Sequence, residues 1–142
     1  MDHVVYLDHK AKELDNLHKG TKTMIIRGAM GRKLPHGRVE ADDTLYFIEN
    51  NGDGIVKAKA TVATAFHSTQ LTPEESLTLV EKHQSYLQLN DGLKKRFAGK
   101  RYIVLITIKD FCIIDAFGID LSAYGNMDDW LPVGNINNVK TP

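Results

Sequence analysis

The amino-acid sequence predicts an α+β protein: a small, mainly antiparallel β-barrel with two or three flanking helices. Several β-rich segments follow one another along the chain with only turns or short loops between them, which favours antiparallel pairing. Two other segments carry the capping residues and the hydrophobic spacing of helices. The chain has 142 residues, of which 42% are hydrophobic and 25% charged, so it is long enough for one domain with a sizeable core.

The first half of the chain is expected to contain one helix and four strands. A helix is expected from Asp8, a good capping residue, to about Lys19, where Gly20 ends it. The run Asn-Asn-Gly-Asp-Gly at 50–54 tolerates positive φ and indicates a tight hairpin turn. The strand after this turn alternates, with lysines on its polar face. Strands are expected at residues 3–7, 23–27, 44–49 and 55–66.

The second half opens with a clear helix start. Thr72 can cap the helix, Pro73 suits its first position, and Glu75 completes a capping box. This helix is expected to reach about Leu89. The remaining expectations are a helical turn at 93–97, strands at 102–109 and 111–115, loop from 116 onward with at most one short element, and a frayed end over 135–142.

The charges are balanced in number and segregated along the chain. There are 18 basic and 18 acidic residues, whereas a protein that grips long nucleic acid usually carries an excess of positive charge. Segments 17–38 and 92–109 contain no acidic residue, and segment 110–139 contains no Lys or Arg. If the two basic segments share a face, one side of the molecule is positive. The alternative is a set of scattered, solvated charges.

The only cysteine, Cys112, excludes a disulfide within the chain. It lies in the apolar run 111–114 and is expected to be a buried thiol, which agrees with a reducing cytoplasm. No run approaches the about 18 apolar residues of a membrane-spanning helix, and the first residues lack the pattern of a signal peptide. A cytoplasmic protein without a membrane partner is therefore expected.

The stretch from Gly20 to Phe66 carries a family resemblance. Residues 20–27 read Gly-Thr-Lys-Thr-Met-Ile-Ile-Arg, and Pro-His-Gly-Arg-Val at 35–39 leads into Leu-Tyr-Phe at 45–47. This series resembles ASCH domains, a branch of the PUA-like β-barrels, whose signature G-x-K-x-x-E-x-R is followed by Pro-x-Gly-x-Val and Gly-Asp-x-Leu-Tyr-Phe. Ile25 stands at the glutamate place. The resemblance covers about residues 4–132 and implies a single PUA-like domain over 1–142.

Lys22 and Arg27, both part of that signature, are the first candidates for a binding site. A guanidinium suits phosphate oxygens or a base edge, and a lysine adds a mobile positive charge. The resemblance implies that both line a cleft between the barrel and its helices. Strand alternation places Thr23 with Arg27, and Lys22 joins them only if it precedes the regular strand or lies at a bulge. The alternative is two ordinary charges at a strand edge.

The glycine-rich loop at 28–38 and the late tryptophan are further candidates. The loop offers backbone amides and basic side chains that can meet phosphates; alternatively, it is only a surface connection. Trp130 matches a tryptophan often found late in ASCH domains, and it either stacks on a base or, as lone tryptophans more often do, packs at a core edge. The candidate ligand-binding residues are Lys22, Thr23, Arg27, Arg32, Lys33, His36, Arg38 and Trp130.

These residues favour a protein that binds nucleic acid, RNA rather than DNA, or a nucleotide fragment, and that is not an enzyme. The zero net charge argues for a short or local ligand rather than a long duplex. No metal or other cofactor is expected, because no two of the six histidines have helical ligand spacing and there is no Cys/His cluster. The sequence does not indicate an oligomeric state.

Two alternatives remain open. Some ASCH proteins are amidohydrolases that remove the acetyl group of N4-acetylcytidine, and the resemblance would give the catalytic roles to Lys22, Thr23 and Glu74. Ile25, however, stands where such enzymes have their threonine, and an isoleucine cannot replace a hydroxyl nucleophile. The other alternative is a protein-interaction module that uses the acidic segment at 110–129 as its contact surface.

Overall fold

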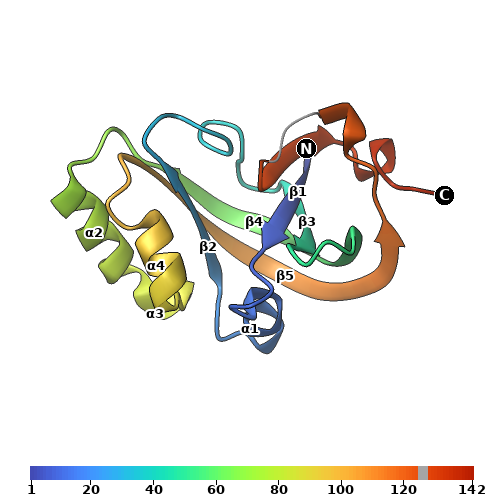
Figure 1. Cartoon of the computed structure of the whole chain (residues 1–142), viewed down its shortest axis with the longest axis horizontal. Helices are drawn as coiled ribbons and strands as arrows, with labels where there is room; N and C mark the ends of the chain where they lie inside the picture. The colour runs from blue at the N-terminus through green and yellow to red at the C-terminus, as the bar shows by residue number, and fades with distance from the viewer. Residues whose placement is uncertain (125–127) are drawn as a thin grey trace.

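The computed structural model describes residues 1–124 and 128–142. Its strands form one curled, mixed sheet in the order β2-β5-β4-β3-β1-β6 (Figure 1). Neighbouring strands are antiparallel except β1 and β3, which are parallel. The expected α+β fold with a mainly antiparallel, barrel-like sheet is therefore confirmed. The strands are β1 (Asp2–Leu7), β2 (Met24–Ala29), β3 (Thr44–Glu49), β4 (Ile55–His67), β5 (Tyr102–Gly118) and β6 (Trp130–Gly134).

The helices are short, and three of them form one group. Helices α2, α3 and α4 lie together beside β2, whereas α1 lies apart from them (Figure 1). Among the described helices, none has both the length and the apolar character needed to cross a membrane. The helices are α1 (Glu13–Lys19), α2 (Pro73–Lys82), α3 (Gln84–Leu87) and α4 (Asp91–Phe97), with 3₁₀ turns η1 (Ser122–Tyr124) and η2 (Ile136–Asn138).

Local sequence rules account for the β3–β4 hairpin and for the start of α2. The turn at 50–54 joins β3 to β4, and every second residue of β4 from Val56 to Val62 is buried, as its alternation predicts. At α2, the Thr72 hydroxyl accepts a hydrogen bond from the Glu75 amide (3.1 Å), and the Glu75 carboxylate accepts one from the Thr72 amide (2.9 Å). The predicted capping box is therefore present.

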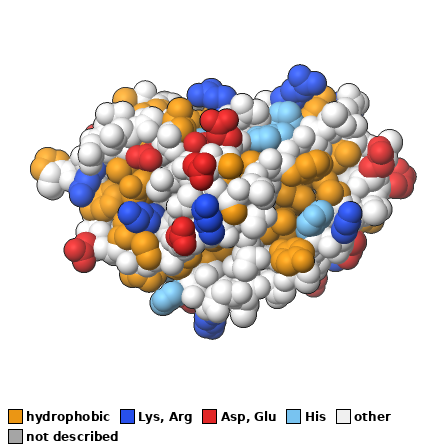
Figure 2. All heavy atoms as spheres, turned by 180° about the vertical axis from the view of Figure 1, so that it is seen from behind, with side chains coloured by type: hydrophobic (Ala, Val, Ile, Leu, Met, Phe, Trp, Pro, Cys, Tyr) orange, Lys and Arg blue, Asp and Glu red, His pale blue; other side chains and the backbone are white. Residues whose placement is uncertain are grey.

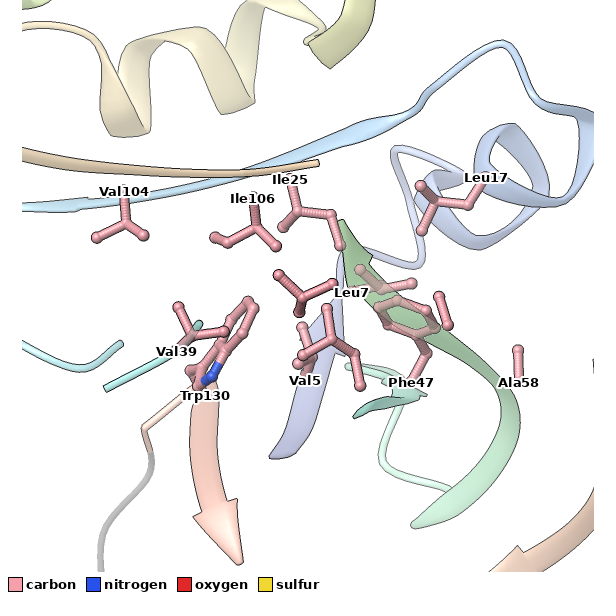
Figure 3. Packing of buried hydrophobic residues seen from close by; sticks show 13 residues of the cluster. Val5, Leu7, Leu17, Ile25, Val39, Phe47, Ala58, Val104, Ile106 and Trp130 are labelled. Atoms are coloured by element: carbon pink, nitrogen blue, oxygen red, sulfur yellow. The ribbon is translucent and has the colours of Figure 1, made fainter. Parts of the chain in front are cut away.

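The core lies on both sides of β2 and β5. Inside the curl of the sheet, side chains from all six strands pack together, and Trp130 of β6 points into this cluster (Figure 3). On the other face of the sheet, α2, α3 and α4 bury a second cluster. Ile25 belongs to the first cluster and Ile26 to the second, because successive side chains of a strand point to opposite faces. This explains the continuous apolar run in β2.

Three predicted element boundaries were wrong. The first helix begins at Glu13, not at Asp8, because the Asp8 carboxylate instead accepts the Ala11 amide (2.8 Å) in a preceding turn. The helix after Thr72 ends at Lys82, and His83 separates it from α3. The strands expected at 102–109 and 111–115 are one strand, β5, which has register shifts against β4.

The described residues of the C-terminal region form more secondary structure than the sequence indicated. β6 pairs antiparallel with β1, although 116–142 was expected to be mostly loop. The frayed end expected over 135–142 was wrong, because Ile136 of η2 and Val139 directly after it are buried against β1 and β6 residues. Cys112 was expected to be buried but is exposed: it pairs in register with Lys59 and lies on the solvated face of the sheet.

Candidate functional site

Arg27 is held rigidly in the second half of β2. Its guanidinium donates from Nη1 to the Ile26 carbonyl (2.7 Å) and from Nη2 to the Tyr6 carbonyl. The same group lies near two rings, 5.6 Å from the centroid of Trp130 and 5.9 Å from that of Phe97. The side chain is therefore a fixed, largely buried positive charge rather than a mobile one.

Beside Arg27 lies a pocket of about 340 Å³, here named the basic pocket. Both acid-free segments of the sequence meet here: one supplies Arg27 and Lys33, and the other supplies Arg96 and Lys100. Among the residues that the structure describes, Asp129 is the only acidic one in its lining. The remaining lining residues are Gly28, Ala29, Met30, Gly31, Leu34, His36, Phe97, Tyr102 and Val104.

Gly28 and Tyr102 shape this pocket. A Cβ at Gly28 would lie 2.9 Å from Ile103 Cδ1 and 3.4 Å from Lys100 Cβ, so glycine lets the start of β5 approach β2 closely. Tyr102 presents its ring, and the Arg32 guanidinium lies 5.5 Å from the centroid of that ring. The pocket thus combines positive charge with aromatic surface.

Two carboxylates restrain the basic groups. Asp129 Oδ2 accepts from Arg96 Nη2 (2.8 Å) and lies 3.4 Å from Arg27 Nε. Asp128 Oδ1 is 3.3 Å from Lys33 Nζ. Among the described residues, Arg27 Nε is nevertheless a buried donor without a hydrogen-bond partner, because its contact with Asp129 lacks hydrogen-bond geometry.

A second pocket, of about 620 Å³, adjoins the first and is here named the acidic pocket. Arg27, Arg96, Phe97 and Asp129 line both pockets and so form a shared wall. The acidic pocket has four further carboxylates, together with apolar and neutral polar side chains. Its other lining residues are Tyr6, Asp8, Glu13, Ile48, Glu49, Asn50, Gly52, Gly54, Leu93, Leu121, Ser122, Asp128 and Leu131.

Lys22 lines neither pocket. Only 1% of its surface is exposed; its Nζ lies 3.4 Å from Glu13 Oε2 and donates to the Leu87 carbonyl. Burial lowers the pKa of Lys22, and the carboxylate of Glu13 acts in the opposite direction. The expectation that Lys22 edges an open cleft was therefore wrong, because helices α1 and α3 cover it.

The three residues of the amidohydrolase alternative do not share a pocket. Lys22 is buried against Glu13, whereas Thr23 lines a separate pocket beside Phe66 and Tyr86. Glu74 is exposed in the first turn of α2. Among the described residues, no three His, Cys, Asp or Glu side chains converge in a way that could hold a metal ion.

The other predicted residues divide into two groups. His36 lines the basic pocket while its Nε2 donates to the Ser68 carbonyl (2.8 Å), but Arg38 lines a different hollow. Trp130 is fully buried, and its Nε1 donates to His3 Nδ1 (3.1 Å), so it packs in the core and does not present its ring for stacking on a base. Packing was the more common of the two roles considered for it.

Sequence reasoning did not select three residues of the basic pocket: Arg96, Lys100 and Tyr102. The charge pattern had flagged the segment that contains them, since 92–109 has no acidic residue. The positive character is local to the pocket. On the face seen in Figure 2, Lys and Arg side chains are interspersed with Asp, Glu and hydrophobic side chains. That face is therefore not uniformly basic.

Comparison with known proteins identifies the fold. An ASCH protein from Zymomonas mobilis superposes with a TM-score of 0.62 over 90% of this chain and 82% of that chain, at 14% sequence identity. A serine-to-alanine variant of it gives 0.63 over the same shares at 13% identity, and a tyrosine-to-phenylalanine variant gives 0.60 over 85% and 76% at 16% identity. No protein-family model matches the sequence, and no curated protein is significantly similar to it. The likeness to the Zymomonas mobilis structures is therefore one of fold.

Proposed function

From the ASCH fold of this chain, we propose that the protein binds nucleic acid, as a short single-stranded RNA or a nucleotide, in the basic pocket. The observation that carries this proposal is the meeting of two separate basic segments in one hollow, where Lys33, Arg96 and Lys100 surround the fixed charge of Arg27. Guanidinium and ammonium groups bind phosphate oxygens through charge-assisted hydrogen bonds. With 18 basic and 18 acidic residues, the chain suits a short ligand.

Aromatic surface and a free acceptor support a single-stranded RNA as the ligand. The ring of Tyr102 lines the pocket and offers a stacking partner for one of the bases of a short strand. In the described part of the chain, Asp129 Oδ1 takes part in no hydrogen bond or ion pair, so it can accept from a ribose 2′-hydroxyl. DNA lacks that hydroxyl, which is why RNA is favoured.

The two alternative functions have less support. Ile25, at the threonine place of the amidohydrolases, is fully buried in the core, and Lys22 is occupied by Glu13. Within the acidic segment at 110–129, Asp128 and Asp129 contact basic side chains of the pocket rather than forming a free acidic surface.

The proposal is tested by fluorescence anisotropy with short labelled single-stranded RNA and DNA, at low and near-physiological salt. The variant Lys33→Ala/Lys100→Ala removes two positive charges from the basic pocket. Its control, Lys10→Ala/Lys19→Ala, removes two exposed charges next to or within α1, outside the basic pocket. We expect the parent to bind RNA more tightly than DNA, with an affinity that falls as salt rises.

The pocket variant is expected to bind at least about tenfold more weakly, and the slope of log K against log salt should shrink by roughly 1 to 1.5, since each phosphate contact in a single strand contributes about 0.7. The control variant should match the parent. Equal losses in both variants, or no binding by the parent even at low salt, would exclude the basic pocket as a nucleic-acid site.

A further inference from the structure

The basic and acidic pockets adjoin each other and differ in the sign of their charged side chains. Arg27, Arg96, Phe97 and Asp129 line both of them. The charged side chains differ on the two sides of this wall: the basic pocket adds Lys33 and Lys100, and the acidic pocket adds the carboxylates of Asp8, Glu13, Glu49 and Asp128. A ligand that extends across the wall would therefore need an anionic end and an end rich in hydrogen-bond donors.

Most carboxylates of the acidic pocket already have a basic partner. Glu49 contacts His9 Nδ1 (2.8 Å) and Lys57 Nζ (3.5 Å), and Glu13 lies 3.4 Å from Lys22 Nζ. Asp128 and Asp129 pair with Lys33 and with Arg96 and Arg27. The pocket thus offers many acceptor oxygens with little uncompensated charge. This favours a neutral, donor-rich group over a multivalent cation.

Asp8 is the exception among these carboxylates. Within the described residues it forms no ion pair; its Oδ1 accepts only the Ala11 amide, at 2.8 Å. The same pocket is also lined by Ile48, Leu93 and Leu131, which supply apolar surface suited to the face of a ring. A volume of about 620 Å³ is within the usual range of small-molecule sites.

The shared wall contains Arg27 Nε, a buried donor that has no hydrogen-bond partner within 1–124 and 128–142. The carboxylate oxygen 3.4 Å from it, Asp129 Oδ2, is already bound by Arg96 at 2.8 Å. An anionic group in the basic pocket would attract the Arg96 guanidinium and leave Asp129 free to turn toward Arg27. Filling the basic pocket would therefore satisfy this donor, which is an independent indication that the wall belongs to a ligand site.

We propose that the two pockets form one nucleotide site, with the phosphate in the basic pocket and the base in the acidic pocket, and that the acidic pocket selects bases with an exocyclic amino group over uracil. Carboxylates only accept hydrogen bonds at neutral pH. The amino groups of cytosine, adenine and guanine donate hydrogen bonds to a carboxylate. O4 of uracil is itself an acceptor, so a carboxylate oxygen repels it. This proposal rests on the proposed nucleic-acid binding and specifies its ligand class.

The test uses CMP and UMP, whose bases differ at two positions: C4 carries an amino group in cytosine and a carbonyl oxygen in uracil, and N3 is an acceptor in cytosine and an N–H donor in uracil. Isothermal titration calorimetry compares both ligands on the parent, on Asp8→Asn and on Lys100→Ala, with Asp15→Asn, an exposed carboxylate of α1, as the charge-matched control. The parent is expected to bind CMP about tenfold more tightly than UMP, as one charge-assisted hydrogen bond allows.

Each variant has a distinct expected result. Asp8→Asn should reduce the CMP/UMP ratio to about threefold or less, while Lys100→Ala should weaken both ligands equally and keep the ratio. Asp15→Asn should leave the parent values unchanged. Equal affinities of the parent for CMP and UMP, or an unchanged CMP/UMP ratio in Asp8→Asn, would overturn base selection by the acidic pocket. The proposed function would still stand in that case if the anisotropy assay showed RNA binding. Absence of RNA, CMP and UMP binding together would overturn both.

Discussion

Replacing Lys22 by Met is expected to destabilise the protein by about 3–5 kcal/mol. The methionine keeps the apolar stem of the side chain but removes the ammonium. The carboxylate of Glu13, of which only 8% is exposed, then stays buried without a cation and keeps only the Asp8 amide as a donor (2.8 Å). The Leu87 carbonyl loses its lysine donor as well.

The geometry supports this magnitude. At a separation of 3.4 Å between Lys22 Nζ and Glu13 Oε2, and with an effective dielectric constant of about 20, the Coulomb attraction is about 5 kcal/mol before desolvation. For a domain of this size, about 1 kcal/mol of stability corresponds to roughly 3–4 °C in Tm, so a decrease of about 9–20 °C is expected.

A double-mutant cycle in urea, followed by circular dichroism and by the fluorescence of Trp130, separates the pair from its surroundings. Glu13→Gln alone leaves the Lys22 ammonium buried and is also expected to be costly. The double variant Lys22→Met/Glu13→Gln should lose less than the sum of the single variants, with a coupling of about 2–3 kcal/mol. Additive single effects, or a Lys22→Met variant within about 0.5 kcal/mol of the parent, would refute the reasoning.

Three further results are expected. Burial lowers the pKa of His3 below 6.5, so near and below this pH the unfolded chain takes up a proton that the folded chain does not. The free energy of unfolding should therefore fall as pH drops below 6.5. In thermal melts between pH 5 and 7.5, the variant His3→Gln should show a weaker dependence of Tm on pH. Ile136→Ala should lower the free energy of unfolding by about 2–3 kcal/mol in urea titrations, because the side chain is only 8% exposed. A negligible decrease would instead support a frayed end over 135–142. Thr72→Ala should cost about 1 kcal/mol of thermal stability through loss of the cap, whereas Thr72→Ser, which keeps a hydroxyl, should stay close to the parent.

The parts of the fold that the sequence predicted depend on neighbours within a few residues. The turn at 50–54 and the alternation of β4 each follow from residue types at short spacing, and so does the capping box at Thr72. β6 escaped prediction because Pro132 and Gly134 are poor strand residues. At the edge of a sheet, where one side of the strand needs no hydrogen bonds, Pro132 is tolerated.

In the candidate site, too, features set by nearby residues could be predicted, whereas features set by distant contacts could not. The signature pointed to Arg27, and the charge pattern pointed to the segment that carries Arg96 and Lys100. That these side chains meet is set by the packing of α4 against β2, which no local pattern encodes. Lys22 was misplaced for the same reason: its partner Leu87 is 65 positions away along the chain. A lysine in a strand signature does not reveal whether a helix will cover it.

The place of β1 in the sheet has a consequence for synthesis on the ribosome. β1 is near the start of the chain, yet it lies between β3 and β6, and its Val5 pairs with Trp130 of the last strand. Until β6 has been translated, one side of β1 carries unpaired amides and carbonyls next to the apolar side chains that Trp130 will cover. Co-translational folding therefore cannot be completed early, and chains that stop before residue 130 should be prone to aggregation.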